Sequence, residues 1–255
     1  MLEKAEQLNS AVEEVLAEDE TLAANVAQVV PEGTKERFIP MQLLKEWDRS
    51  RLGYRFVKRA FDIAFSGCVI VVGLIPALVL CAIIYAESPG NPIYVQTRVG
   101  RTHRDGSMHE FKMFKFRSMV KDADKKLDGL LDKNEVQGAM FKMKNDPRIT
   151  RVGKFIRKHS IDEFPQFINV FLGDMTVVGP RPPLPREVAQ YTEHDLQRLA
   201  VKPGVTGLWQ VTERNNVGFD DMVELDLTYI KNSGPLYDLK LVVKTVAVMF
   251  EGEAS

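Results

Sequence analysis

Two adjacent acids, Asp162 and Glu163, stand in a segment that is otherwise rich in lysine and arginine. Paired carboxylates among cations are typical of sites that handle an anion together with a metal ion. An ionised Asp can attack phosphorus, as in enzymes that form an aspartyl phosphate, and a neighbouring acid can hold a divalent cation. The pair therefore predicts phosphoryl chemistry, with Asp162 as nucleophile and Glu163 as metal ligand.

A structural explanation competes with this one, because Ser160 followed by Glu163 matches the capping box of a helix N-terminus. In that case Glu163 would only cap a helix. Carboxylates in a first helical turn are held ionised by the helix N-terminus, and here also by the nearby Arg157. We favour the catalytic interpretation because of the cations around the pair.

Two further side chains, Arg181 and Lys115, could bind a phosphate. Arg181 lies in the segment Gly179–Pro183, whose prolines cannot donate hydrogen bonds, so this rigid loop is suited to present Arg181 rather than to join a sheet. Lys115 lies on a predicted strand, and both a phosphate ligand and a solvated strand face remain open for it. Asp226 lies on a predicted helix and would, taken alone, be a surface residue.

A second loop, Lys202–Gln210, contains Gly204 and Gly207, which would permit close approach of the backbone to a ligand. Its spacing fits neither a Walker A loop nor a Rossmann fingerprint. The histidines are scattered without metal spacing, and Cys68 and Cys81 lie within an apolar segment. These residues predict neither a zinc site nor a disulfide.

That apolar segment, Ile63–Tyr85, carries no charge over about 23 residues, or roughly 34 Å of helix. Helices in soluble cores rarely run this long without a polar face, so a membrane helix is expected. Pro76, in the middle of the segment, removes a backbone hydrogen bond and predicts a kink. The chain has no recognisable signal peptide.

Basic residues flank both ends of the apolar segment, which fits both ends lying in the cytoplasm. A helix broken at Pro76 that enters and leaves by the same leaflet satisfies the kink and the charges together. A proline-kinked helix that spans the membrane is the alternative, and composition leaves the two open.

The net charge of −1 hides an uneven distribution. Residues 1–50 form an acidic, amphipathic extension, with a helix over 1–30 whose stripe from Leu8 to Leu22 could mediate homo-oligomerisation. Residues 51–90 combine a basic, aromatic approach with the re-entrant membrane helix, and residues 91–255 form the expected catalytic domain. The basic middle of the chain favours phosphate-bearing partners such as anionic membrane lipids. Because its cations lie beside a bilayer segment, we expect no nucleic acid partner.

The predicted fold class is α+β and mainly helical, with a compact cytoplasmic domain of short strands and helices. Strands are expected at 93–96 and 111–116, around a Gly100–Gly106 turn. Expected helices cover 118–132, a segment ending at 154–158, and 164–171, 191–199, 220–231 and 236–250. The last helix could lie on the membrane interface by its apolar face or pack on the domain.

Several motifs in one order resemble the bacterial sugar transferase family, the monotopic polyprenyl-phosphate hexose-1-phosphate transferases or phosphoglycosyl transferases. The motifs are Lys58–Asp62, the apolar segment, Gln96–Gly100, Phe114–Met119, the two acids, Gly173–Pro182 and Lys202–Gly207. The resemblance covers roughly Phe56 to Asp238. It implies a re-entrant helix broken near Pro76, although Ile75 stands where members commonly have Ser.

The resemblance also implies the chemistry. Asp162 would attack the β-phosphate of a nucleoside diphosphate sugar, with uridine as the expected base, to form a covalent phosphosugar intermediate. Undecaprenyl phosphate would then accept the sugar phosphate, which starts exopolysaccharide, O-antigen, lipopolysaccharide or glycoprotein glycan synthesis at the bacterial inner membrane. Glu163 would bind the cofactor Mg²⁺.

Four residues match family positions around the phosphates. They are Lys115, Arg157, Arg181 and Asp226. A non-catalytic membrane adaptor that binds anionic lipid is the alternative, but it gives no reason for the paired acids. Longer members of the family carry four spanning helices before this region, and residues 1–50 depart from that pattern.

Overall fold

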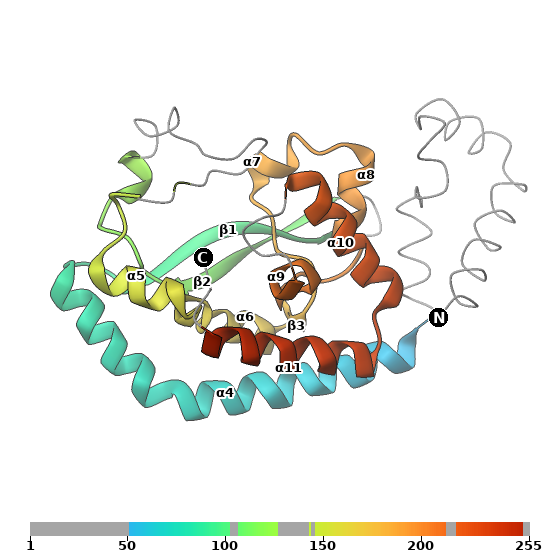
Figure 1. Cartoon of the computed structure of the whole chain (residues 1–255), viewed down its shortest axis with the longest axis horizontal. Helices are drawn as coiled ribbons and strands as arrows, with labels where there is room; N and C mark the ends of the chain where they lie inside the picture. The colour runs from blue at the N-terminus through green and yellow to red at the C-terminus, as the bar shows by residue number, and fades with distance from the viewer. Residues whose placement is uncertain (1–50, 103–106, 127–142, 144–145, 213–217, 252–255) are drawn as a thin grey trace, which may run out of the picture.

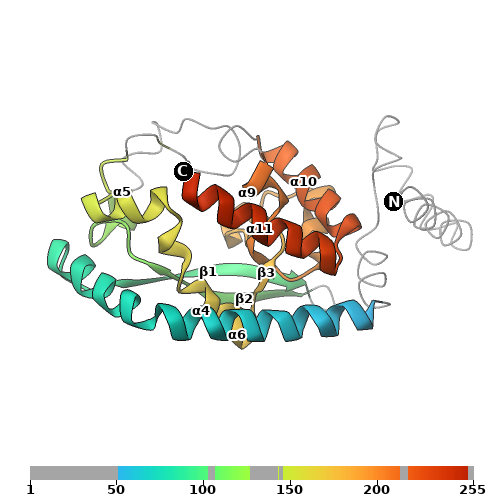
Figure 2. The ribbon, with the colours of Figure 1, turned by 60° about the horizontal axis from the view of Figure 1, so that its bottom comes forward.

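The computed structural model describes residues 51–102, 107–126, 143, 146–212 and 218–251. The acidic helix expected over 1–30, the apolar stripe within it and the tip of the 100–106 turn lie outside these ranges. Within them, a domain of short helices and strands sits on one long helix, α4 (Leu52–Glu87) (Figures 1 and 2).

Most of the surface of α4 is not covered by the rest of the chain. Asp62, Ser66 and Ile84 are its only buried residues, whereas Val71 and Ile75 are 75% and 74% exposed. This is a helix long and apolar enough to cross a membrane by length and composition, and only 6% of its most apolar window is buried. The core helix of a soluble protein would be mostly buried, so the exposed surface of α4 suits an apolar medium.

The helix runs through Pro76 without interruption and ends at Glu87. Figure 1 shows that its course is bent, with the second half turning towards α5 (Arg151–Lys158). The predicted break at Pro76 is not seen as a break in the helix, and re-entry stays a prediction.

Polar side chains in the first half of α4 attach it to the domain. Asp62 Oδ1 accepts hydrogen bonds from Thr176 Oγ1 at 3.0 Å and from the Val177 backbone N–H at 2.9 Å. Lys58 Nζ donates to Asp238 Oδ2 at 2.7 Å and to the Val178 carbonyl at 2.9 Å. These partners lie on β3 (Thr176–Val178) and α11 (Pro235–Glu251), so one face of α4 is bound to the protein.

Two small sheets position the loops of the domain. β1 (Ile93–Thr102) and β2 (Met108–Phe116) form an antiparallel ribbon, which confirms the predicted strand pair and extends both strands. β3 pairs in parallel with β4 (Gly204–Thr206), which joins two loops that are distant in the sequence. Phe111 and Met113 point from β2 into the main core.

Short helices make up most of the remainder. They are η1 (Ala123–Lys126), η3 (Ile161–Glu163), α6 (Gln166–Leu172), α7 (Pro185–Val188), α8 (Glu193–Leu196), η4 (Gln197–Ala200), α9 (Leu208–Thr212) and α10 (Phe219–Asn232).

The helices predicted at 164–171, 191–199, 220–231 and 236–250 are confirmed by α6, by α8 with η4, by α10 and by α11. The helix predicted at 118–132 is wrong in its described part, where only the 3-10 turn η1 forms. The physical reason is the left-handed backbone of Asp122, with φ of 61°, which an α-helix cannot contain.

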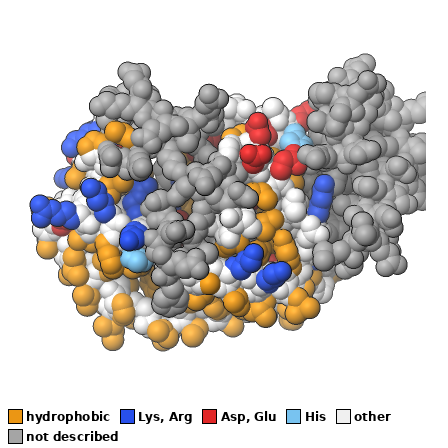
Figure 3. Space-filling model, viewed as in Figure 1, with side chains coloured by type: hydrophobic (Ala, Val, Ile, Leu, Met, Phe, Trp, Pro, Cys, Tyr) orange, Lys and Arg blue, Asp and Glu red, His pale blue; other side chains and the backbone are white. Residues whose placement is uncertain are grey.

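The main core joins β2, β3, α6, α10 and α11. A second cluster of Ile84, Phe116 and Ile156 packs the end of α4 against β2 and α5. On α11, Leu241 is buried in the main core while Leu236 and Val243 are 83% and 62% exposed, so this helix both packs on the domain and presents an apolar strip. Hydrophobic side chains follow the lower edge of the molecule along α4 (Figure 3). The fold is mainly helical with a few short strands and one long apolar helix, which fits the predicted class.

Candidate active site

Asp162 and Glu163 lie on η3, a single 3-10 turn that follows α5. Ser160 starts this turn with a left-handed backbone, φ of 53°, and its side chain makes no capping hydrogen bond. The alternative of a capping box is therefore wrong, because the Glu163 N–H donates to the Ser160 backbone carbonyl at 3.2 Å and no capping bond forms with the Ser160 side chain. Glu163 is not a helix cap of that kind, and its carboxylate faces Lys115 instead.

Lys115 connects both acids. Its Nζ atom, on β2, donates to Glu163 Oε1 at 2.8 Å and lies 4.0 Å from Asp162 Oδ2. The Lys115 side chain is 22% exposed, so it does not lie on a solvated strand face. The structure thus brings together three of the residues that the sequence singled out.

The two acids differ in their electrostatics. Burial raises the pKa of Asp162, and the charge of Glu163 raises it further, against the opposing effects of Lys115 and Arg157. Burial also acts to raise the pKa of Glu163, but the charge and hydrogen bond of Lys115, together with Arg181 and Gln166, lower it overall. We expected both acids to be held ionised by a helix N-terminus. The pKa of Asp162 shifts in the opposite direction, because η3 is too short to offer a helix N-terminus and the site is buried.

Arg157 is placed near Asp162 by the end of the long helix. Glu87, the last residue of α4, accepts hydrogen bonds from the backbone N–H groups of Arg151 and Val152 at 2.8 and 3.0 Å. These N–H groups begin α5, whose last turn contains Arg157. The effect of Arg157 on the pKa of Asp162 follows from this arrangement.

Phe164 makes a second contact between the site and α4. Its ring lies so close to Gly73 that a Cβ atom there would collide with it. The residue directly after the paired acids therefore packs against the middle of α4, near Pro76. Glycine is required at this position by the close approach.

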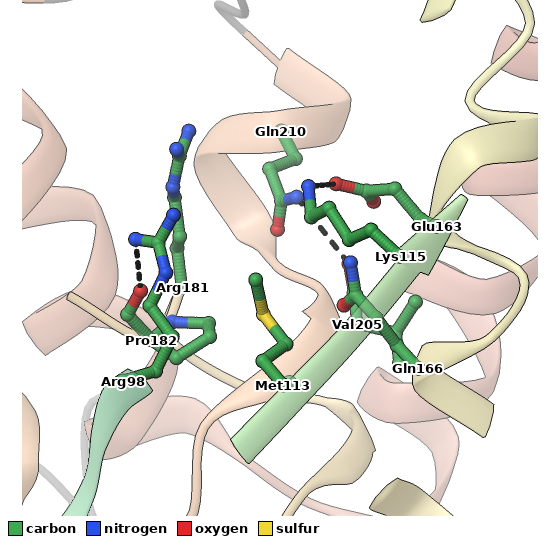
Figure 4. Close-up of a pocket in the computed structure, with 10 residues that line it drawn as sticks. Arg98, Met113, Lys115, Glu163, Gln166, Arg181, Pro182, Val205 and Gln210 are labelled. Atoms are coloured by element: carbon green, nitrogen blue, oxygen red, sulfur yellow. Dashed lines mark hydrogen bonds and ion pairs between the residues drawn. The ribbon is translucent and has the colours of Figure 1, made fainter. Parts of the chain in front are cut away.

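The Gly179–Pro183 loop is held through its carbonyl groups. Backbone N–H groups of Gly204 and Val99 donate to the carbonyls of Pro180 at 2.8 Å and of Pro183 at 2.9 Å. With its backbone fixed, the loop presents the Arg181 side chain to the pocket that Glu163 and Lys115 also line (Figure 4). This is the role that the sequence predicted for Arg181.

The glycines of the 202–210 loop were predicted to let the backbone approach a ligand, but they mainly allow this loop to pack against the Gly179–Pro183 loop. A Cβ atom at Gly204 would collide with the Gly179 backbone, and one at Gly207 would lie 2.7 Å from the Gly179 carbonyl oxygen. They therefore allow two loops to touch. Gly204 also lines the pocket, where it leaves room beside Val205.

Asp226 lies behind the pocket rather than in its lining. It is fully buried and forms an ion pair with Arg198, which also donates to the Arg181 carbonyl at 3.3 Å. Burial raises the pKa of Asp226 to about 6, although Arg198 opposes this shift. Asp226 thus supports the Arg181 loop through Arg198, a residue that sequence reasoning missed because nothing in its neighbourhood marks it.

The complete pocket is more positive than negative. Its lining consists of Arg98, Met113, Lys115, Glu163, Gln166, Arg181, Pro182, Gly204, Val205 and Gln210. Three cations thus face one carboxylate, which already pairs with Lys115. Sequence reasoning also missed Arg98, Gln166 and Gln210, although Arg98 lies in the Gln96–Gly100 motif and Gln210 ends the 202–210 loop. Such a lining can bind an anion with several negative charges.

Among the described residues, no group of three or more His, Cys, Asp or Glu side chains could hold a metal ion. Of the two acids, Glu163 lines the pocket and Asp162 lies beside it on the same turn. Mg²⁺ commonly uses one or two carboxylates, with waters and substrate phosphates completing its shell. The pair is therefore compatible with a magnesium ion that binds together with a phosphate substrate.

A sequence model of bacterial sugar transferases matches residues 53–252, which include every residue of the site. The chain belongs to the bacterial sugar transferase family. This confirms the family resemblance seen in the sequence.

Other members of the sugar transferase family are clearly similar to this chain. It is 44% identical over 190 residues to the galactosyl transferase CpsE of Streptococcus agalactiae, covering 71% of this chain and 41% of that protein. It is 42% identical over 205 residues to the UDP-galactose-lipid carrier transferase of Erwinia amylovora, covering 79% and 42%. The chain spans less than half the length of these two relatives. The exopolysaccharide production protein ExoY of Rhizobium meliloti is 35% identical over 193 residues, covering 74% and 83%.

The shared contact with Lys115 predicts the effect of its removal. In Lys115→Gln the pKa of Asp162 should rise further above its usual value of about 4, and the pKa of Glu163 should rise from its lowered position. Titration of the carboxyl carbons by ¹³C NMR in detergent micelles measures both. Because the folded-state pKa of Glu163 is lowered, this acid stabilises the fold above its unfolded pKa of about 4.3, and that contribution is lost as the pH falls.

The matched control is Lys112→Gln on the same strand, whose ammonium group bonds the exposed Thr97 hydroxyl and not the acids. It should leave both titrations unchanged. An Asp162 titration that is the same in Lys115→Gln and in the wild type would contradict the proposed electrostatic coupling.

Proposed function

We propose that this protein transfers a hexose 1-phosphate from a nucleoside diphosphate sugar, with uridine as the base, to undecaprenyl phosphate. The observation that carries the proposal is the convergence of Asp162, Glu163 and Lys115 at a cationic pocket beside an exposed apolar helix. The names of relatives support it, because one is a UDP-galactose-lipid carrier transferase and another an undecaprenyl-phosphate galactose phosphotransferase. The reaction would start exopolysaccharide, O-antigen or glycoconjugate synthesis.

The reaction proceeds in two displacements. An ionised Oδ atom of Asp162 attacks the β-phosphorus, a bond forms between them, and the bond from the β-phosphorus to the bridging oxygen breaks. The nucleoside monophosphate leaves with that electron pair, so a phosphosugar remains on Asp162. A phosphate oxygen of undecaprenyl phosphate then attacks the same phosphorus, and the Asp162 carboxylate leaves.

The surroundings of Asp162 suit a nucleophile that must lose water before it attacks. Burial raises its pKa, so the carboxylate is more basic than an exposed one, while Lys115 and Arg157 favour its ionised form. The same cations would face the phosphate oxygens in the transition state. A rate that depends on ionised Asp162 would fall as the pH drops through its raised pKa.

Mg²⁺ is the proposed cofactor. Glu163, with Asp162 beside it, would hold the ion, and the bound ion would neutralise phosphate charge during the transfer. Glu163 suits this role because its pKa is lowered, so it is ionised at neutral pH. The contact of Glu163 with Lys115 keeps its carboxylate at the pocket.

We also propose that α4 enters and leaves the cytoplasmic leaflet of the bacterial inner membrane without crossing it. Support comes from its two ends. Lys58 near the start bonds Asp238, whereas Glu87 at the end bonds the first turn of α5, so one domain contacts both ends of the helix. A domain on one side of a membrane could not hold both ends of a spanning helix. Pro76 lies in the apolar middle, where a bend would reverse its direction.

A non-catalytic adaptor that binds anionic lipids is disfavoured. Such a protein needs exposed cations near the bilayer. It gives no reason for Lys115 to lie between two partly buried acids, or for a loop with bonded carbonyls at Pro180, Pro182 and Pro183 to present Arg181.

Asp162→Asn tests the covalent step. Wild-type protein mixed with UDP-sugars and Mg²⁺, without acceptor, should release about one equivalent of UMP with its correct donor and gain one sugar phosphate in mass. The peptide that contains Asp162 should carry it. In the variant, release should fall roughly 10³-fold or more, because the nucleophile is lost.

The control is Asp174→Asn, a nearby acid that faces His109 rather than the pocket. It should keep full release. If release required undecaprenyl phosphate and no adduct formed, the covalent intermediate would be wrong while the transfer itself could stand.

Removal of the metal ion gives a separate test. A chelator should abolish UMP release, added Mg²⁺ should restore it, and Glu163→Gln should raise the Mg²⁺ concentration needed for half of the maximal rate. Full activity in the presence of excess chelator would rule out a metal requirement.

The position of the chain ends tests re-entry. With reporter tags on the N- and C-terminus in intact cells, both tags should be cytoplasmic, because both ends of α4 belong to one domain. An N-terminal tag in the periplasm with a cytoplasmic C-terminus would show that α4 spans the membrane.

A further inference from the structure

Among the described residues, three arginines are almost fully buried, and they differ in their partners. Arg148 forms an ion pair with Asp146 at 2.6 Å, and Arg198 forms one with Asp226. Arg98 is only 6% exposed, yet no carboxylate of the described chain lies within ion-pair distance of it. A buried charge without an opposite charge is costly, so Arg98 stands out as a cation that lacks its anion.

The contacts of Arg98 satisfy only part of its guanidinium group. One Nη atom donates to the Pro182 carbonyl at 3.0 Å and the other to Gln96 Oε1 at 2.7 Å. Nε has no partner in the described structure. Further N–H donors therefore remain on a group that lines the pocket.

The neighbours of Arg98 increase the need for an anion. Burial lowers its pKa to about 10, and the positive charge of Arg181 acts in the same direction. Glu187 and Glu163 oppose the shift from a distance, but both are engaged elsewhere. Glu187 accepts from the Leu184 N–H at 2.7 Å, and Glu163 pairs with Lys115. Neither acid is available to Arg98.

The ribbon of β1 and β2 places Arg98 at the opposite end of the pocket from the catalytic acids. Lys115 pairs with Tyr94 and Phe111 pairs with Arg98, so Arg98 and Lys115 lie on the same face, separated by four residues of β1. At about 3.3 Å per residue, this is about 13 Å between their backbones, which two long side chains can shorten. Figure 4 shows Arg98 and Arg181 on one side of the pocket and Lys115 with Glu163 on the other.

We propose that Arg98, together with Arg181, binds the phosphate group that leaves with the nucleoside. This inference rests on the proposed function. When the bond from the β-phosphorus to the bridging oxygen breaks, the electron pair stays on that oxygen, which belongs to the departing nucleoside monophosphate. N–H donors of two guanidinium groups compensate the charge that develops there. Lys115 and Glu163 lie at the other end of the pocket, beside the phosphate that stays bound to Asp162.

Undecaprenyl phosphate carries the same kind of phosphate group. We assign the Arg98 end of the pocket to the nucleotide because Arg98 is on β1, whereas Phe164 next to the acids packs on the apolar helix α4. A lipid phosphate that arrives along α4 would reach the acids first. The test below includes both kinds of phosphate, that of the nucleotide and that of the lipid.

The experiment is a calorimetric titration of the full chain in detergent micelles with UMP, uridine and farnesyl phosphate, the last as a short polyprenyl phosphate. In Arg98→Gln, UMP should bind roughly tenfold more weakly or worse, because a charge-assisted hydrogen bond is lost. Uridine, which lacks the phosphate, and farnesyl phosphate should bind as to the wild type. Arg98→Lys keeps the charge and should recover part of the UMP affinity.

The matched control is Arg186→Gln, which removes an exposed cation near the same loop. It should leave UMP affinity unchanged. Thermal denaturation of each variant shows whether it folds. If Arg98→Gln does not fold, the salt dependence of UMP binding is compared between Arg98→Lys and the wild type.

Unchanged UMP affinity in a folded Arg98→Gln, equal loss of UMP and uridine binding, or loss of farnesyl phosphate binding alone would each overturn the proposal. These outcomes are separate from failure of the proposed function. If the wild type releases UMP but Arg98→Gln binds UMP with unchanged affinity, the proposed transferase function stands and the proposed role of Arg98 is wrong. If no sugar donor gives UMP release but phosphate binding still depends on Arg98, the transferase function is wrong and the role of Arg98 in phosphate binding stands.

Discussion

An apolar helix that carries a buried carboxylate constrains the rest of this structure. Asp62 lies in α4, where it accepts hydrogen bonds from Thr176 and Val177 and so fixes the helix to the first strand of the parallel pair. The side of α4 away from this contact is apolar and exposed. A helix with these two properties is suited to protein on one face and an apolar medium on the other.

The site follows from that anchor because β3 leads directly into the Arg181 loop. Lys58 of α4 and Tyr229 of α10 both donate to the carbonyl of Val178, the last residue before the loop. At the other end of the helix, Glu87 fixes the start of α5 and hence Arg157. Phe164 contacts the middle of the helix at Gly73. Three segments around the site are therefore positioned by one helix.

The charged side chains differ between the two ends of the pocket, with the acids and Lys115 at one end and two arginines at the other. Lys115 bonds Glu163 directly and lies farther from Asp162. The pKa of Glu163 is lowered, whereas the pKa of Asp162 is raised. The lower pKa suits a metal ligand and the higher one suits a nucleophile. At the far end, two guanidinium groups lie close together with no carboxylate of the described residues within ion-pair distance, an arrangement that an anion would stabilise.

The sequence alone determined the local features whose signals are local. The length of the apolar segment, the helices of α10 and α11 and the family itself could all be predicted, because periodicity and ordered motifs are written in neighbouring residues. The paired acids, Lys115 and Arg181 were also recognised, since their residue types imply phosphate chemistry.

Only the tertiary structure decided the rest. The left-handed Ser160 begins a single 3-10 turn in place of the expected helix N-terminus, and burial reversed the pKa shift expected for Asp162. Asp226 proved to support Arg181 through Arg198 from behind the pocket, while Arg98 entered its lining. Burial and charge pairing depend on residues that are far apart in the chain, so a linear pattern cannot tell a buried arginine with a carboxylate partner from one without.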